Sequence, residues 1–164
     1  IEEIDKDFNV INDSKEKEYL YLFAFGDKFH PFCAPIMTTI LADLDISLMM
    51  KAAKLFVGEH NFKAYCYRPS ETGNFIRVIE NCELVENDQY TANFFPEKSY
   101  LLKVRAKGFG RNQIRLMMGA LIEVGKGELS LNDFKKTLSE DFDEQLSYIA
   151  PASGLILNKV EFNL

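Results

Sequence analysis

The sequence lacks the signatures of several large enzyme classes. It contains no GxGxxG, GxxxxGK[ST] or GxSxG motif, so the common signatures of nucleotide-binding proteins and hydrolases are missing. Its only histidines are His30 and His60, too few for a histidine-rich metal site, so we expect no metal. The cysteines, Cys33, Cys66 and Cys82, are odd in number and form no CxxC pair. They predict reduced core thiols in a cytoplasmic protein.

Long apolar runs are also missing. No run approaches the roughly 20 residues that cross a bilayer, and no signal peptide is recognisable, so we expect a soluble protein with no membrane partner. The 164 residues are 47% hydrophobic and 13% aromatic, which is typical of a folded protein and predicts a single domain over residues 1–164. The chain begins at Ile1 without a methionine, which either processing or a fragment would explain.

Against a net charge of -6, one stretch is strongly basic. A strand predicted from Ser99 to Ala106 alternates apolar residues with Lys103 and Arg105. Five basic residues then follow one another with no acidic residue between them: Lys103, Arg105, Lys107, Arg111 and Arg115. Because local fields decide where a polyanion docks, this run suggests an anionic partner.

Arg111 and Arg115, the last two residues of this run, lie at the start of a predicted helix from about Asn112 to Val124, ended by Gly125 and Gly127. Its apolar face comprises Ile114, Met117, Met118, Leu121 and Val124. Arg111 and Arg115 are expected side by side on one flank, at the helix end where cations are unfavourable by a few tenths of a kcal/mol. Alternatively, both arginines only extend to solvent. Gly119 leaves space for a ligand or another segment.

The remaining pattern predicts mainly strands. They are Phe8–Ile11 before a turn at residues 12–14, a central strand Lys17–Phe25, Phe75–Glu86 in an antiparallel hairpin with 99–106, and Leu155–Phe162. Two further helices are capped by Asp45, running to Val57 before Gly58, and by Ser130 with Asp133, running to about Leu138. The fold class is therefore α+β: a mainly antiparallel sheet with helices packed on one face and the other face available for a partner.

Five motifs in order resemble the tRNA pseudouridine synthase A family. They are Lys-x-Tyr-x-Tyr from Lys17, Gly-Glu-x-Asn-Phe-x-x-Tyr from Gly58, Arg-x-Ile from Arg77, Phe-x-x-x-x-Ile-Arg-x-Met-x-Gly-x-Leu-x-x-Val-Gly from Phe109, and Ala-Pro-Ala-x-Gly-Leu-x-Leu from Ala150. The resemblance runs from about Phe8 to Phe162 and implies a pseudouridine-synthase-like fold. It also implies tRNA as the partner and no cofactor, and it allows a homodimer of the full-length protein.

The resemblance further implies roles for two residues. Tyr19 matches the active-site tyrosine that stacks on the extruded base and assists proton removal, and Arg115 matches the arginine that pairs with a nucleophilic aspartate. Family members carry that aspartate in an Arg-x-Asp-x-Gly segment that this sequence does not contain. The resemblance therefore suggests a C-terminal portion that supplies the tyrosine and the arginine but not the nucleophile.

RNA binding is expected of the remaining basic residues, because extruding a base costs a few kcal/mol that backbone contacts must offset. The candidates are Lys103, Arg105, Lys107 and Arg111, with Lys17, Arg68 and Arg77 in addition. Gly110-Arg111-Asn112-Gln113 differs from the histidines that relatives often have before the Ile-Arg pair. Two alternatives stay open: a non-catalytic RNA-binding α+β module, and an interaction domain whose basic run is only a solvated face.

Overall fold

The computed structural model describes residues 6, 8–9 and 14–162. Six strands comprise β1 (Ser14–Phe25), β2 (Thr38–Ile40), β3 (Gly58–Asn61), β4 (Ile76–Glu86), β5 (Tyr100–Ala106) and β6 (Leu155–Phe162). The α-helices in this part of the chain are α1 (Ile46–Lys54), α2 (Gln113–Gly125) and α3 (Leu131–Lys136). Short 3-10 helices are η1 (Pro31–Cys33), η2 (Lys63–Tyr65) and η3 (Ala152–Gly154). Most of the strand predicted at residues 8–11 and its turn lies outside the described residues, and Ser14 already belongs to β1.

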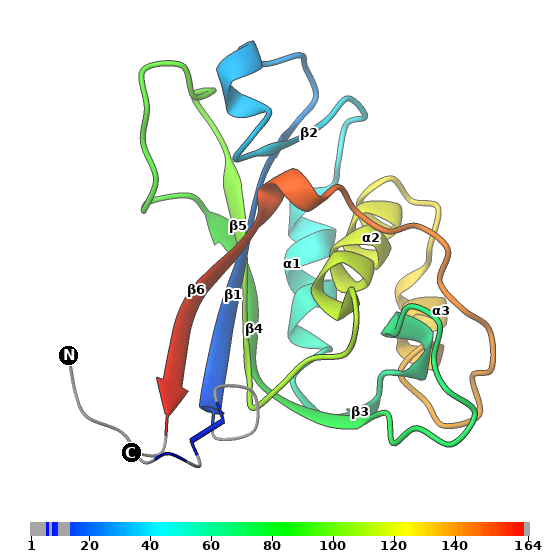
Figure 1. The fold of residues 1–164 in the computed structure, drawn as a ribbon. Helices are drawn as coiled ribbons and strands as arrows, with labels where there is room; N and C mark the ends of the chain where they lie inside the picture. The colour runs from blue at the N-terminus through cyan, green and yellow to red at the C-terminus, as the bar shows by residue number, and fades with distance from the viewer. Residues whose placement is uncertain (1–5, 7, 10–13, 163–164) are drawn as a thin grey trace.

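All six strands form one sheet around β1 (Figure 1). The strand order is β2-β1-β5-β4-β3, and β6 pairs with β1 on the edge that β2 also uses. Only the short β1–β2 pairing is parallel, which confirms the mainly antiparallel sheet of an α+β fold. From Leu20 to Ala24, β1 is buried on both faces, because it has a neighbouring strand on each edge and side chains of the two cores packed above and below.

The three α-helices lie on one side of the sheet (Figure 1). They enclose the larger core, to which β1 contributes Tyr21 and Phe23 and which nearly all of α2 enters. α1 crosses α2 where Gly125 faces Met49, because a Cβ on Gly125 would meet the Met49 sulfur at 2.5 Å. No helix within the described residues is long and apolar enough to span a membrane.

The opposite face of the sheet is partly covered, which corrects the expectation that it is open to a partner. Leu20, Leu22 and Leu101 form a second, smaller core with Cys33 and Met37 from the segment after β1. Aromatic residues from the long β4–β5 connection pack against it. This cover protects the end of the sheet beside β2 and leaves the end beside the start of β1 to charged side chains.

Several predicted boundaries need correction. β2 and β3 were not among the predicted strands. α1 ends at Lys54 rather than Val57, although its Asp45 cap is confirmed by the bond from the Leu48 N–H, 2.9 Å long. α3 is likewise shorter, but Ser130 and Asp133 form the expected cap. α2 ends through Gly127 at φ +75°, whereas Gly125 is inside the helix.

Candidate active site

Tyr19 and Arg115 line the same pocket, of about 170 Å³, on the side of the sheet that the helices cover. β1 supplies Lys17 and Tyr19, the start of α2 supplies Arg115, and β6 supplies Leu155. The segment between β5 and α2 closes the remaining side with Phe109, Gly110, Asn112 and the first residues of α2. Three regions that are distant in sequence therefore meet at this point: β1, the segment that leads into α2, and β6.

Tyr19 is held by its strand and by one aromatic neighbour. In β1 it has the same orientation as Tyr21, which is fully buried, but it lies nearer the start of the strand and stays half-buried. The ring of Phe109 contacts it edge to face, with 5.4 Å between ring centroids and an interplanar angle of 88°. The tyrosine ring is thus fixed in place and still accessible from the pocket.

Arg115 is anchored through one nitrogen only. Its Nε donates to the Ala150 carbonyl at 2.6 Å, and the Ala150 N–H donates back to the Arg115 carbonyl at 3.1 Å. Within the described residues no carboxylate lies within 4 Å of this guanidinium. A permanent positive charge is therefore oriented at the pocket with its terminal nitrogens available for an acid.

The anchor of Arg115 is itself fixed by tight packing. There is no open space beside Gly119, because a Cβ at this position would meet the Tyr148 carbonyl oxygen at 2.0 Å. Of the two alternatives for Gly119, a neighbouring segment and not a ligand occupies the position. The same segment continues to Pro151, whose carbonyl accepts a hydrogen bond of 2.7 Å from the Tyr21 hydroxyl. Burial raises the pKa of Tyr21 to about 12, so this donor keeps its proton at neutral pH.

The segment before α2 departs from the predicted helix. Asn112 has φ +58°, a left-handed conformation, so α2 begins only at Gln113 and Arg111 lies outside the helix. The buried Gln113 side chain turns back, and its Oε1 accepts the Gly110 N–H at 2.7 Å. Arg111 and Arg115 consequently have different partners and do not lie side by side along a helix.

The electrostatic character of the pocket follows from its lining. Lys17 and Arg115 contribute two cations, and none of the lining residues is acidic. The walls contributed by Tyr19, Phe109 and Leu155 are flat or apolar. Such a site favours a ligand that combines a planar ring with negative charge, or a ring together with a carboxylate from elsewhere.

Three more of the predicted RNA-binding residues do not line this pocket but lie on segments next to it. Arg111 directly joins two pocket-lining residues, and its guanidinium lies 5.4 Å from the centroid of the Tyr67 ring. Arg68 reaches the same ring, at 5.2 Å. Lys107 is exposed in the segment that follows β5. Tyr67 was not singled out from the sequence, because only the fold brings it to Arg111.

The other predicted RNA-binding residues are placed differently. Lys103 and Arg105 point to the face of the sheet opposite the helices and the pocket. They alternate along β5 with Leu102, Val104 and Ala106, which are buried under the helices. Arg105 Nε lies 2.5 Å from Glu16 Oε1 and 3.8 Å from Glu80 Oε2. Arg77, at the start of β4, donates from Nη1 to the Asn74 carbonyl at 2.9 Å.

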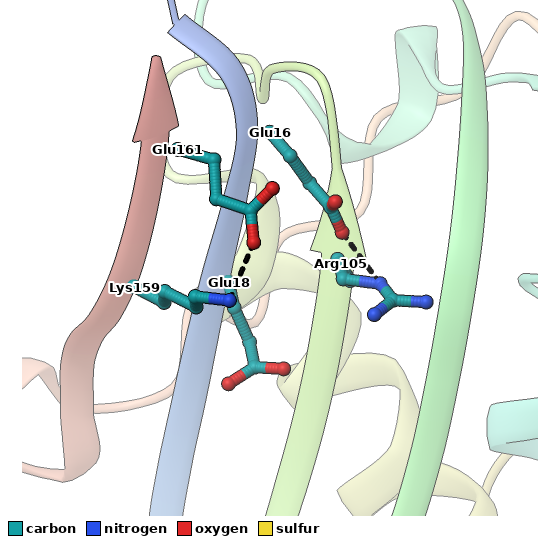
Figure 2. A pocket seen from close by; sticks show the side chains of 5 residues that line it. All are labelled: Glu16, Glu18, Arg105, Lys159 and Glu161. Carbon is teal, nitrogen blue, oxygen red and sulfur yellow. Dashed lines mark hydrogen bonds and ion pairs between the residues drawn. The ribbon is translucent and has the colours of Figure 1, made fainter.

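Figure 2 shows the surroundings of Arg105. Arg105 shares a hollow of only about 50 Å³ with residues of β1 and β6, where Lys159 forms an ion pair with Glu161. Glu18 belongs to the same group and accepts a hydrogen bond of 2.6 Å from the Asn158 amide. The basic face predicted for β5 is therefore offset by acidic neighbours from β1, β4 and β6.

Sequence reasoning named only part of the pocket. Phe109 and Leu155 occur in the quoted motifs but received no role, and Gln113 was noted only as part of a departure from the family pattern. No local sequence signal indicated that Gln113 turns back onto Gly110. No group of three or more histidine, cysteine or acidic side chains suited to a metal ion occurs in the described part of the chain.

Comparison with known proteins gives a consistent result. Residues 52–163 match the family model described as tRNA pseudouridine synthase. The chain is 31% identical over 157 residues, 96% of its length, to the tRNA pseudouridine synthase A of Staphylococcus aureus strain MRSA252, of which it covers 56%. It is 29% identical over 163 residues, 99% of its length, to that of Listeria monocytogenes serotype 4a strain HCC23, of which it covers 62%. The chain thus spans little more than half the length of these curated relatives, and it belongs to the tRNA pseudouridine synthase family.

Proposed function

We propose that the full-length protein containing this chain isomerises uridine to pseudouridine in tRNA, and that this chain supplies Tyr19 and Arg115. The observation that carries the proposal is that both residues line one pocket whose lining has no acid. The names of the relatives in Staphylococcus aureus and Listeria monocytogenes support tRNA as the substrate class.

The reaction needs no net change in atoms. An aspartate from a segment outside this chain attacks C1′ of the ribose, and the bond from N1 to C1′ breaks, leaving its electron pair on the base. The base turns in the pocket, C5 forms a bond to the same ribose carbon, and the bond between that carbon and the aspartate breaks, which restores the free carboxylate. C5 then loses its proton and N1 gains one. Because the base is neither oxidised nor reduced, the chemistry requires binding, orientation and proton transfer from the protein.

Each residue would perform a distinct part of this sequence. Arg115 would hold the aspartate by a two-pronged ion pair through its free terminal nitrogens, since Nε is already bonded to Ala150. Tyr19 would offer its ring as a stacking surface for the extruded base and its hydroxyl for removal of the C5 proton. Lys17, at the same pocket, would attract the phosphodiester chain of the RNA.

The proposal is tested in the full-length protein with tRNA carrying tritium at C5 of uridine, since the C5 hydrogen is released when the carbon–carbon bond forms. Arg115→Ala should lower the rate by on the order of 100-fold or more. Arg115→Lys should not restore it, because one ammonium cannot form a two-pronged contact. Stability should fall by only about 1 kcal/mol, the worth of the single bond to Ala150.

Tyr19 gives a second, separable measurement. Tyr19→Phe keeps the ring and should lower kcat with little change in tRNA affinity, whereas Tyr19→Ala should also weaken binding by about 1–3 kcal/mol of lost stacking. Retained activity of Arg115→Ala together with a large loss of stability would refute the role assigned to the arginine. The absence of an acid from the pocket also fits a non-catalytic RNA-binding module, and that function would show as tRNA binding by the wild-type protein without tritium release.

A further inference from the structure

Two arginines that are distant in sequence converge on one tyrosine at the edge of the pocket. Arg68 follows η2 and Arg111 precedes α2, and their guanidinium carbons lie 5.2 Å and 5.4 Å from the centroid of the Tyr67 ring. The two loops are joined by a backbone hydrogen bond from the Tyr67 N–H to the Arg111 carbonyl, 3.0 Å long. Arg68 and Arg111 are called the arginine pair, and Tyr67 is the ring that both contact.

The arginine pair carries two charges without a counter-charge. Neither arginine forms an ion pair with any acidic residue that the structure describes. Both are exposed, and because each lies within 5.4 Å of the same centroid, the guanidinium carbons are less than about 11 Å apart. Contact with the ring face attracts each cation but supplies no negative charge. An anion bound to both would supply that charge and use their N–H donors.

The backbone supports a built arrangement and not a chance encounter of surface side chains. Arg68 has φ +52° and Asn112, next to Arg111, has φ +58°. These are the only non-glycine residues with positive φ in the described chain, and both adjoin or belong to the arginine pair. Left-handed backbone at such residues is unfavourable and is enriched at ligand-binding sites.

The position next to the pocket limits what the anion can be. Gly110 and Asn112, on either side of Arg111, both line the pocket that contains Tyr19 and Arg115. An anion at the arginine pair would thus lie just outside a base held in that pocket. In an RNA strand, the group that lies just outside an extruded base is a backbone phosphodiester.

We propose that Arg68 and Arg111, supported by Tyr67, together bind one phosphodiester of the RNA strand beside the nucleotide whose base enters the pocket. The inference rests on the proposed function, which supplies RNA as the ligand. It adds a shared contact to one phosphate and a supporting tyrosine.

The test is tRNA binding by the full-length protein at a series of salt concentrations, by fluorescence anisotropy. Arg68→Ala and Arg111→Ala should each reduce the slope of log affinity against log salt by about one unit at most, and the double variant should reduce it by less than the two single effects added. Tyr67→Phe should behave as wild type, whereas Tyr67→Ala should show part of the loss. Lys28→Ala is the control, because Lys28 is exposed beyond the opposite end of β1.

The outcomes separate the inference from the proposed function. Variants with wild-type slopes in a protein that makes pseudouridine overturn the arginine pair and leave the proposed function standing. Slopes that depend on the pair in a protein that makes no pseudouridine do the reverse. Additive effects of the two single variants would mean separate phosphates and overturn the shared contact. Displacement of RNA by inorganic phosphate at constant ionic strength, in the wild type but not in the double variant, would indicate a free-phosphate site instead.

Discussion

Gly119→Ala offers a direct measurement of how the Arg115 anchor is built. An alanine inside a helix is normally about 1 kcal/mol more favourable than glycine. Here the new methyl group would lie 2.0 Å from the Tyr148 carbonyl oxygen, so the backbone at Tyr148 must move by more than about 1 Å to reach an ordinary contact. Overpacking of this kind costs about 1–3 kcal/mol.

The displacement would extend to the site. Ala150 lies two residues beyond Tyr148, and its two hydrogen bonds with Arg115 contribute about 0.5–1.5 kcal/mol each. After subtracting the helix preference, we expect Gly119→Ala to lower the free energy of unfolding by roughly 1–5 kcal/mol, or about 2–4 °C in Tm per kcal/mol. Because Arg115 loses its anchor, the rate of pseudouridine formation should fall more steeply than stability alone explains.

Thermal and urea unfolding of the purified protein measure this prediction. Gly108→Ala is the matched control, since a Cβ there has no heavy atom within 4 Å and should change stability by less than about 1 kcal/mol. A Gly119→Ala variant that melts at or above the wild-type temperature would show that residues 148–150 do not pack on α2 as described.

Two further predictions concern buried polar groups around the pocket. Burial raises the pKa of Tyr21 from 10 to about 12, so the contribution of Tyr21 to stability is complete below pH 10 and declines as the pH rises from about 10 to about 12. Tyr21→Phe should flatten that decline in Tm, and an unchanged profile would contradict the assignment. Gln113→Leu leaves the Gly110 N–H without its partner and should lower the free energy of unfolding by about 1–2 kcal/mol. It should also lower kcat/KM in the tritium-release assay. Wild-type values in both the unfolding and the tritium-release measurements would refute the role of Gln113.

Local patterns gave correct predictions where the governing contacts are local in sequence. Asp45 and Ser130 cap helices because each side chain bonds the N–H three residues later, a relation visible in the sequence. The alternation of β1 likewise identified a strand buried on both faces. Tyr19 and Arg115 were predicted from the resemblance alone, since no local pattern relates a residue of β1 to one at the start of α2; the structure shows that both line one pocket.

Errors arose where the partner is far away in sequence. β3 has four residues and β2 three, and each exists because a neighbouring strand offers backbone bonding partners. The sequence around Arg105 contains no acid, but the sheet places Glu16 and Glu80 against it from two other strands. A left-handed Asn112 could not be anticipated from a helical pattern that continues through it, and it is this residue that separates Arg111 from Arg115.

The alternation of a strand therefore decides which basic residues can serve the pocket. Lys17 and Tyr19 are two residues apart on β1 and share a side, whereas Lys103 and Arg105 fall on the other side and Arg105 is largely offset by carboxylates. The basic run is continuous in sequence but divided by the sheet. The cations that remain at or beside the pocket come from the start of β1, from the start of α2 and from the loops around Arg68 and Arg111. On the proposed function, an RNA strand that delivers a base to Tyr19 should accordingly cross these loops. It should gain little binding energy from the face of the sheet opposite the helices.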